Sequence, residues 1–560
     1  MKRIFALIML AALLLTGCAA GNTTPAQDAD TSPEEGEDIT QDSPSVYELS
    51  DRGEAIVDDA GLLPAVATED NCRVFYEIFV GSFSDSNGDG IGDLRGIIDR
   101  MDYLNDGDAS SGLSLGVEGL WLTPIFKSGS YHKYDVDDYY AIDPAFGTEE
   151  DLKELLESCH ERNVKLILDL VINHTGARNP WFTAFADAHR QGDTEDPYYD
   201  FYTYYTEGES APAGRSFSKL AGTDIYYESN FSGSMPELNY DNEAVRQAVL
   251  DVAKYYLDLG VDGFRFDAAK YIYFGDNTQS AAFWDWYIDE LKAIKPDIYT
   301  VAEVWDADGI TDQYFPALNC FNFTLSQPGG LIAQAAKAGN VNTYTAYVQS
   351  YVERVRALNE DAMIVPFIAN HDTDRAAGYL TASTGELYMA ANLYLLSPGS
   401  PFIYYGEELG LKGSRGGANT DANRRLKMEW GDGDTVSDPE GTTYSSTRVA
   451  ATAIEQMADG NSPYNYYKKL IMLRKANPAI SRGDYTALAF ENTKLGGFTA
   501  SYEGVTVAVL HNTTTEAVTV DLSTVTDLPF THIRAAIGLG SATLDGTTLT
   551  LDPQTSVGLG

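Results

Sequence analysis

Cysteine is scarce in this 560-residue chain, which contains only four. Cys72, Cys159 and Cys320 stand far apart, and Cys18 lies near the start. A disulfide-stapled domain uses a denser, even-numbered set, and common zinc sites use paired spacings such as Cys-x-x-Cys. The sequence therefore argues against both frameworks, and we expect the three later cysteines to be buried core residues.

Basic residues are also few, with 38 Lys and Arg against 83 Asp and Glu, so that the net charge is −45. Phosphate backbones are bound by clusters of Lys and Arg, and anionic lipid surfaces attract basic patches. The composition therefore excludes nucleic acid as the expected partner and excludes an electrostatic membrane contact. A neutral ligand fits the charge better.

The apolar run at residues 4–15 follows Lys2 and Arg3 and is too short to span a bilayer comfortably. It is typical of a signal peptide, and the ending "LTGC" resembles a bacterial lipobox in which Cys18 is lipidated. An ordinary cleaved signal peptide is the alternative. Residues 19–46 are acidic and rich in Pro, Gly, Ser and Thr, which predicts a flexible tether. We expect an exported protein on the outer face of the bacterial membrane, attached to it only through this lipid.

Short β-rich runs alternate with amphipathic helical stretches from about residue 73 onward. Eight such runs lie at residues 73–83, 116–126, 164–172, 261–267, 298–305, 319–325, 362–370 and 400–408. Runs of this kind, separated mostly by helices, predict a closed (β/α)8 TIM barrel. An open doubly wound sheet is less favoured because no Gly-x-Gly-x-x-Gly turn follows the first run.

Two stretches depart from the alternation. Residues 173–235 are rich in Tyr, Gly, Ser and Pro without a helical period, which predicts an insertion domain after the third strand. From residue 481, short alternating strands separated by turn residues predict an all-β sandwich. The expected parts are a signal peptide with lipobox (1–18), an acidic linker (19–46), the first part of the barrel (47–172), the insertion (173–235), the rest of the barrel (236–480) and the C-terminal domain (481–560).

Three acidic residues, Asp267, Glu303 and Asp372, stand at the ends of three different predicted strands. Any one of them alone is explained as a cap of the following turn. Because the carboxyl ends of all barrel strands meet at one face, the three together indicate an active site there.

Cleavage of a glycosidic bond needs two such residues, one ionised carboxylate as nucleophile and one protonated carboxyl as acid. Arg265 stands two residues before Asp267, on the same strand face, and its charge would favour the ionised carboxylate. Apolar neighbours of Glu303 would favour its protonated form. Asp372 could stabilise positive charge that develops on the sugar ring.

The strings "DLVINH", "GFRFDAAK", "EVW" and "FIANHD" occur in this order, together with "GVEGLWLTPIF", "MPELN" and "GSPFIYYGEELG". From about residue 75 to 484 the chain thereby resembles the α-amylase superfamily of glycoside hydrolases. The resemblance implies a retaining mechanism with Asp267 as nucleophile, Glu303 as acid/base and Asp372 as stabiliser of the transition state.

The resemblance also implies a set of substrate-binding residues around the cleaved sugar, with Asp169 pairing to Arg265. They are Tyr134, Asp135, His174, Arg265, Lys270, His371 and Arg375, with His132 beside Tyr134.

The segment "DSNGDGIGDLRG" places oxygen donors at positions 1, 3, 5 and 9 of an EF-hand-like loop, with the carbonyl of position 7 as a further donor. These donors are Asp85, Asn87, Asp89, Ile91 and Asp93. Position 12 is Gly96 rather than Glu, so the loop is not an EF-hand. We expect a structural Ca²⁺ ion here, with Mg²⁺ as the alternative.

The expected activity is internal hydrolysis of α-1,4-glucosidic bonds in starch, glycogen or malto-oligosaccharides by a monomer. Ala268, after the nucleophile, resembles α-1,4-acting members more than α-1,6-glucosidases. The motif "MPELN" departs from the family's usual forms by its Glu237, yet it resembles most an intermediate group of mixed activities. An α-glucosidase or a 4-α-glucanotransferase is the alternative, and a surface lipoprotein that binds glucan without catalysis is a further one.

Overall fold

The computed structural model describes residues 68–109, 111–337, 339–381 and 385–560. The predictions for residues 1–18 and 19–46, including lipidation of Cys18, lie outside these residues. None of the described helices is long and apolar enough to cross a membrane. The three described cysteines, Cys72, Cys159 and Cys320, are free and buried as expected.

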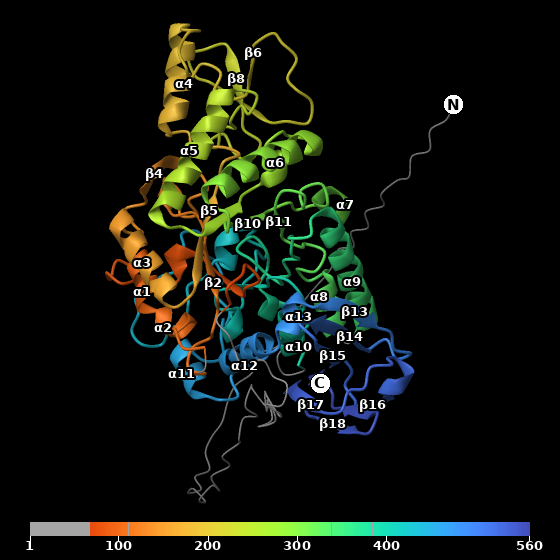
Figure 1. The fold of residues 1–560 in the computed structure, drawn as a ribbon. Coiled ribbons are helices and arrows are strands. Elements are labelled where there is room, and N and C mark those ends of the chain that lie inside the picture. The colour runs from red at the N-terminus through yellow and green to blue at the C-terminus, as the bar shows by residue number, and fades with distance from the viewer. Residues whose placement is uncertain (1–67, 110, 338, 382–384) are drawn as a thin grey trace, which may run out of the picture. The chain divides into compact units, whose positions relative to one another are not determined.

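A parallel sheet of seven strands forms the centre of the fold, in the order β11-β10-β9-β5-β2-β1-β12 (Figure 1). Its strands are β1 (Phe75–Ile78), β2 (Gly119–Leu122), β5 (Lys165–Leu170), β9 (Gly263–Phe266), β10 (Tyr299–Ala302), β11 (Asn319–Cys320) and β12 (Phe402–Tyr404).

The segment 364–368 closes this sheet between β11 and β12. The backbone N–H of Asn322 donates to Val365 O at 3.1 Å, and Phe402 N–H donates to Pro366 O at 3.0 Å. Pro366 has no N–H to donate, which explains why this segment forms only an isolated bridge. With it the ring has the eight members that the apolar runs predict, and the TIM barrel is confirmed.

The barrel strands are buried on both faces, as expected for a parallel sheet under helices. Alternate residues point inward and form a separate aromatic core, which includes Phe75, Trp121, Tyr299, Phe321 and Phe402. The residues between them pack outward against the helices. This period-two division explains the nearly continuous apolar runs of the sequence.

The helices that cover the barrel begin and end at sequence signals. Thr148 and Asp151 form a capping box at the start of α3, and α5 ends at Gly260 in the left-handed conformation. Helices α5 and α6 pack side by side (Figure 1). The helices are α1 (Leu94–Asp99), α2 (Met101–Leu104), α3 (Glu149–Glu161), α4 (Pro180–Gln191), α5 (Glu243–Leu259), α6 (Asn277–Ile294), α7 (Asp308–Thr311), α8 (Leu331–Ala336), α9 (Val341–Leu358), α10 (Glu386–Leu395), α11 (Ala453–Ala458), α12 (Pro463–Ala476) and α13 (Pro478–Arg482).

The stretch between β5 and α5 contains α4 and a small antiparallel sheet of β6 (Tyr204–Thr206), β8 (Ile225–Glu228) and β7 (Phe217–Lys219). A two-stranded sheet of β3 (Phe126–Ser128) and β4 (Val136–Ile142) precedes it. Helix α4 and the three-stranded sheet lie within residues 173–235, where an insertion is predicted, whereas β3 and β4 precede it. Helix α4 itself differs from the prediction, which assigns no helical period to this stretch.

The C-terminal part is all-β, as predicted. One antiparallel sheet has the order β13-β14-β15-β20-β17 and a second has the order β16-β19-β18, with a hydrophobic core that includes residues of both. Strands β13 and β14 lie beside α9 of the barrel (Figure 1), and Tyr485 donates a hydrogen bond to Thr345 O. The strands are β13 (Asp484–Leu488), β14 (Leu495–Tyr502), β15 (Val505–Asn512), β16 (Val518–Asp521), β17 (Ile533–Gly538), β18 (Ala542–Asp545), β19 (Thr548–Leu551) and β20 (Thr555–Leu559).

Candidate active site

One arginine side chain connects carboxylates from three barrel strands. Arg265, at the carboxyl end of β9, is 1% exposed, and its Nη1 donates to Asp169 and to Asp267, each at 2.8 Å. Its Nη2 donates to Glu303, which directly follows β10. Strand alternation places Arg265 and Asp267 on one side, and the β5–β9 register places Asp169 opposite Arg265.

A histidine between two carboxylates forms the second part of the site. His371 is fully buried, with Nδ1 2.5 Å from Glu77 Oε1 and Nε2 3.1 Å from Asp372 Oδ2. The hydroxyl of Tyr134 lies 2.7 Å from the same Nε2 and donates to Asp169 at 2.9 Å. The two parts of the site therefore belong to one hydrogen-bonded network.

The surroundings of Glu303, Asp372 and His371 shift the pKa values of these groups in different directions. Burial raises the pKa of Glu303 to about 7, although Arg265 favours its ionised form. Burial also disfavours charge on Asp372, but His371 beside it holds the pKa of that carboxyl well below its usual value. Burial likewise opposes charge on His371, yet the two flanking carboxylates raise its pKa to about 10. Near neutral pH the site thus contains an ionised Asp372 and a Glu303 able to hold a proton.

The chain turns sharply after the Asp267 carboxylate. Ala268 has φ 48° and ψ 37°, a left-handed conformation that costs a non-glycine residue about 1 kcal/mol. The next residue, Ala269, donates its N–H to Glu303 O at 3.1 Å. The turn therefore fastens the end of β9 to the end of β10 and fixes the two carboxylates relative to each other.

An exposed aromatic ring follows Glu303. Trp305 is 39% exposed and stacks on Phe323 with 4.6 Å between ring centroids and 9° between ring planes. Lys270 fastens this segment, since its Nζ donates to Trp305 O at 2.8 Å and to Asp306 at 3.0 Å. A flat exposed ring beside catalytic carboxylates suits stacking against a sugar.

A second exposed ring comes from the insertion. Phe231 is 48% exposed, and its ring centroid lies 5.2 Å from that of His174 and 5.5 Å from that of Tyr271. His174 itself is buried, with Nε2 3.2 Å from Tyr134 O, and burial lowers its pKa, which favours the neutral ring. The predicted residue His174 thus contacts both Tyr134 of the hydrogen-bonded network and the exposed ring of Phe231.

Two further predicted substrate-binding residues, Asp135 and Arg375, hydrogen-bond to groups of the protein itself. Asp135 accepts hydrogen bonds through Oδ1 from Ser128 and Ser130 of its own loop. Arg375 is 2% exposed and donates to the backbone oxygens of Tyr405 and Arg424, at 2.6 and 2.8 Å. The assignment of Arg375 to the substrate is corrected here, because its guanidinium is buried and donates from Nε and Nη1 to carbonyl groups inside the protein.

Comparison with known proteins identifies the architecture around this network. The model of the alpha amylase catalytic domain matches residues 77–483. The chain belongs to the α-amylase family. It is therefore a glycoside hydrolase of α-amylase type, active on glucans.

Several relatives and solved structures of this family are similar over most of the chain. Alpha-amylase 3 of Dictyoglomus thermophilum is 37% identical over 448 residues, which cover 78% of this chain and 84% of that protein. A 4-alpha-glucanotransferase of Thermotoga neapolitana is 30% identical over 451 residues, 78% of this chain and 95% of the other. The structure of Eubacterium rectale Amy13B superposes with a TM-score of 0.81 at 34% identity, covering 89% of this chain and 97% of that one.

Sequence reasoning missed two residues of this α-amylase site. Glu77 supports His371 from β1, and Arg425 donates from Nη2 to Asp372 Oδ1 at 2.7 Å. Glu77 was detectable as a charge inside an apolar aromatic run. Arg425 lies in an irregular segment, where no strand or helix pattern points toward the site.

The predicted metal loop is wound around its own carboxylates. Asp85 accepts from the backbone N–H groups of Asn87, Gly88 and Gly90, and Asp93 caps α1 by accepting from Gly96 N–H. Asp89 Oδ1 accepts from the Ile91 N–H in the same way. Over the described residues, no three His, Cys, Asp or Glu side chains converge as metal ligands would. Carboxylate, amide and carbonyl oxygens are the donors that Ca²⁺ prefers, and calcium at this loop stays a prediction.

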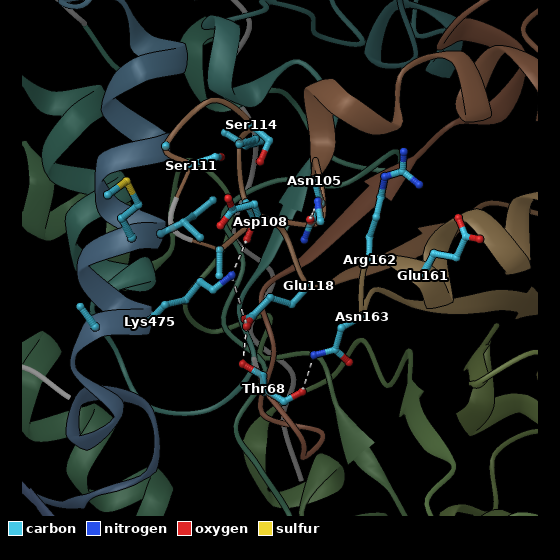
Figure 2. A pocket seen from close by; sticks show the side chains of 18 residues that line it. Thr68, Asn105, Asp108, Ser111, Ser114, Glu118, Glu161, Arg162, Asn163 and Lys475 are labelled. Carbon is cyan, nitrogen blue, oxygen red and sulfur yellow. Dashed lines mark hydrogen bonds and ion pairs between the residues drawn. The ribbon is translucent and has the colours of Figure 1, made fainter. Parts of the chain in front are cut away.

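A cavity of about 240 Å³ lies near the amino ends of the strands (Figure 2). Glu118, directly before β2, and Asn163, shortly before β5, line it together with Lys475 of α12, whose Nζ lies 3.7 Å from Glu118. The catalytic carboxylates follow the opposite ends of the strands, and the amino-terminal face of a TIM barrel contributes to stability rather than catalysis. This cavity is therefore separate from the active site.

Proposed function

We propose that the protein hydrolyses internal α-1,4-glucosidic bonds of starch, glycogen or malto-oligosaccharides with retention of the anomeric configuration. The observation that carries the proposal is the Arg265 guanidinium, which contacts both Asp267 and Glu303 through adjacent nitrogens. Two carboxyl groups this close to one side chain suit a direct attack on the sugar better than attack by an interposed water.

The residues divide the reaction as follows. Glu303 donates its proton to the glycosidic oxygen while an oxygen of Asp267 attacks the anomeric carbon, so that one C–O bond breaks and a glycosyl ester forms. Glu303, now ionised, takes a proton from water, whose oxygen attacks the same carbon and releases Asp267. The ionised Asp372 stabilises the positive charge of both transition states.

A 4-α-glucanotransferase is the second candidate, and one observation favours it. The exposed rings of Trp305 and Phe231 offer two planes on which an acceptor sugar could stack in place of water. Relatives of similar identity include an enzyme named 4-alpha-glucanotransferase. Hydrolysis and transfer share every catalytic residue, so only the attacking nucleophile distinguishes them.

Three further expectations complete the proposal. The protein acts outside the cytoplasm, attached to the bacterial membrane through lipid on Cys18. It acts as a monomer. It carries a stabilising calcium ion at the loop of residues 85–93.

The product profile on starch, maltoheptaose, isomaltose and pullulan tests the proposed activity. Internal cleavage of starch with α-anomeric products supports hydrolysis of α-1,4 bonds. Maltoheptaose converted into longer oligosaccharides would identify a transferase. Activity confined to isomaltose would contradict the proposal.

A further inference from the structure

Arg375 is a buried cation that connects the end of β12 with two points of the segment 413–425. Its own N–H donates to Gly413 O at 2.9 Å, Nε donates to Arg424 O at 2.8 Å and Nη1 donates to Tyr405 O at 2.6 Å. Its guanidinium carbon lies 4.1 Å from the ring centroid of Tyr404 and 4.5 Å from that of Tyr405. The side chain is therefore held rigidly between the end of β12 and the segment 413–425.

The segment that Arg375 holds carries the groups that position Asp372. Arg424 donates from Nη1 to Asp372 O at 2.7 Å, and Arg425 donates from Nη2 to Asp372 Oδ1 at 2.7 Å. Arg425 also donates from Nε to His371 O at 3.1 Å. Both the backbone and the carboxylate of Asp372 thus depend on two consecutive arginines.

Side-chain contacts, rather than a strand or a long helix, fix these arginines. Arg424 donates to Asp374 Oδ1 at 2.8 Å and to Asp421 Oδ1 at 2.9 Å. Arg425 Nη1 donates to the Tyr131 hydroxyl at 3.1 Å.

The segment 413–425 contains one short 3-10 turn, Asp421–Arg424, and no strand or helix of the sheet layers. Apart from Arg375, the hydroxyl of Tyr404 donates to the same Arg424 O, at 3.1 Å. Gly413 allows the close approach, because a Cβ there would lie 2.4 Å from Asn423 O and 3.2 Å from Arg375 Cδ.

We propose that Arg375 is a positioning residue of the active site: it sets the place of Arg424 and Arg425 and, through them, the orientation of Asp372. It touches no substrate. The inference rests on the proposed glucan cleavage, for which Asp372 stabilises the transition state. A displacement of about 1 Å at such a group costs up to a hundredfold in rate.

The test is a double-mutant cycle of Arg375→Met and Arg425→Met, measured as kcat and KM on the substrate that the wild type cleaves. Arg375→Met alone is expected to lower kcat by about tenfold to a hundredfold with little change in KM. In the Arg425→Met background the same substitution is expected to cost clearly less than in the wild type, since the part of its effect that passes through Arg425 is already lost and only the part through Arg424 remains. Equal costs in both backgrounds would overturn the proposal.

The pH dependence of kcat/KM gives a second test, because it would not change if Arg375 only stabilised the fold. Burial opposes the charge of Asp372, whereas His371, Arg425 and Arg265 favour it, so displacement of Arg425 raises the pKa of Asp372. The acid limb of kcat/KM should therefore move to higher pH in Arg375→Met and return partway in Arg375→Lys, which can still reach one carbonyl. An unmoved limb counts against the proposal.

Arg474 provides the matched control. It is 3% exposed and also donates to backbone oxygens, those of Leu395, Ser397 and Gly399, but it lies on α12. Arg474→Lys is expected to lower the melting temperature as Arg375→Lys does, without moving the pH profile. If Arg375→Met fails to fold, Tyr404→Phe removes the other donor to Arg424 O and should shift the same limb in the same direction. The wild type on the four substrates tests the proposed function separately.

Discussion

Nε2 of His371 lies 3.1 Å from the carboxylate of Asp372, while Nδ1 of the same ring lies 2.5 Å from Glu77. Because both nitrogens face carboxylate oxygens, both carry a proton, and the ring is a buried cation with a pKa of about 10. The charged His371 stabilises the ionised form of Asp372, and Glu77 of β1 in turn stabilises the charge of His371.

Replacing Glu77 by Gln should destabilise the protein by about 2–4 kcal/mol at pH 6, because a buried cation loses one of its two partners. The folded-state pKa of His371 lies above its unfolded value of 6.5. The stabilisation is therefore fully present below pH 6.5 and is lost as the pH rises through 10. Urea unfolding of wild type and variant across this range is the measurement. A difference that stays constant from pH 6 to pH 10 would contradict the charged pair.

Activity should fall as the pH rises through about 7, because Glu303 must be protonated to act and burial sets its pKa there. Glu303→Gln should lower kcat/KM on maltoheptaose by about 10²–10⁴-fold. On an aryl malto-oligosaccharide whose phenol leaves without protonation, the loss in the glycosylation step should be much smaller. An equal loss on both substrates would assign the acid to another group.

Asp267→Asn should abolish turnover of starch while circular dichroism stays that of the folded wild type, since the amide keeps the shape of the carboxylate and Arg265 keeps Asp169 and Glu303 as partners. Removing a covalent nucleophile typically eliminates most of the rate enhancement. Starch turnover by the variant and the wild type provides the comparison. Retained turnover in the purified variant would refute the role of Asp267.

The sequence predicts the barrel and the catalytic carboxylates well because both have local patterns. Apolar runs reveal parallel strands, and the strand ends bring distant carboxylates such as Asp169 and Glu303 together without further information. The irregular segments have no such pattern. Arg375 follows Asp372 by three residues and yet turns into the protein, whereas Arg425, 53 positions after Asp372, contacts it. The fold of the segment 413–425 decides which of the two arginines contacts Asp372, and only the structure reveals that fold.

Trp305→Ala should change the balance between transfer and hydrolysis. The exposed ring provides an area on which an acceptor sugar can stack, and such stacking contributes about 1 kcal/mol to binding of the acceptor. The ratio of transfer to hydrolysis products from maltoheptaose is expected to fall by about threefold to tenfold. Ile454→Ala is the control, since that residue is also exposed, on α11. A ratio that changes equally in both variants would remove Trp305 from the acceptor side.

Removal of calcium should lower the melting temperature if the loop of residues 85–93 binds it. The measurement compares protein in chelator with protein in added Ca²⁺ and in added Mg²⁺. Asp89→Ala should remove the effect of calcium on the melting temperature, because Asp89 is one of the predicted ligands. Asp89 is exposed, and its loss leaves the cap of α1 by Asp93 intact, so the variant should still fold. Identical melting temperatures with and without chelator would exclude this site.

Strand β20 is the fourth of five in its sheet, between β15 and β17, although it is the last strand of the sequence. Neither neighbour can complete its hydrogen bonds until residue 559 has been synthesised. The same sheet carries β13 and β14, which lie against α9 of the barrel. A chain that lacks β20 would therefore leave the facing edges of both β15 and β17 unpaired, and such edges are templates for pairing with another chain.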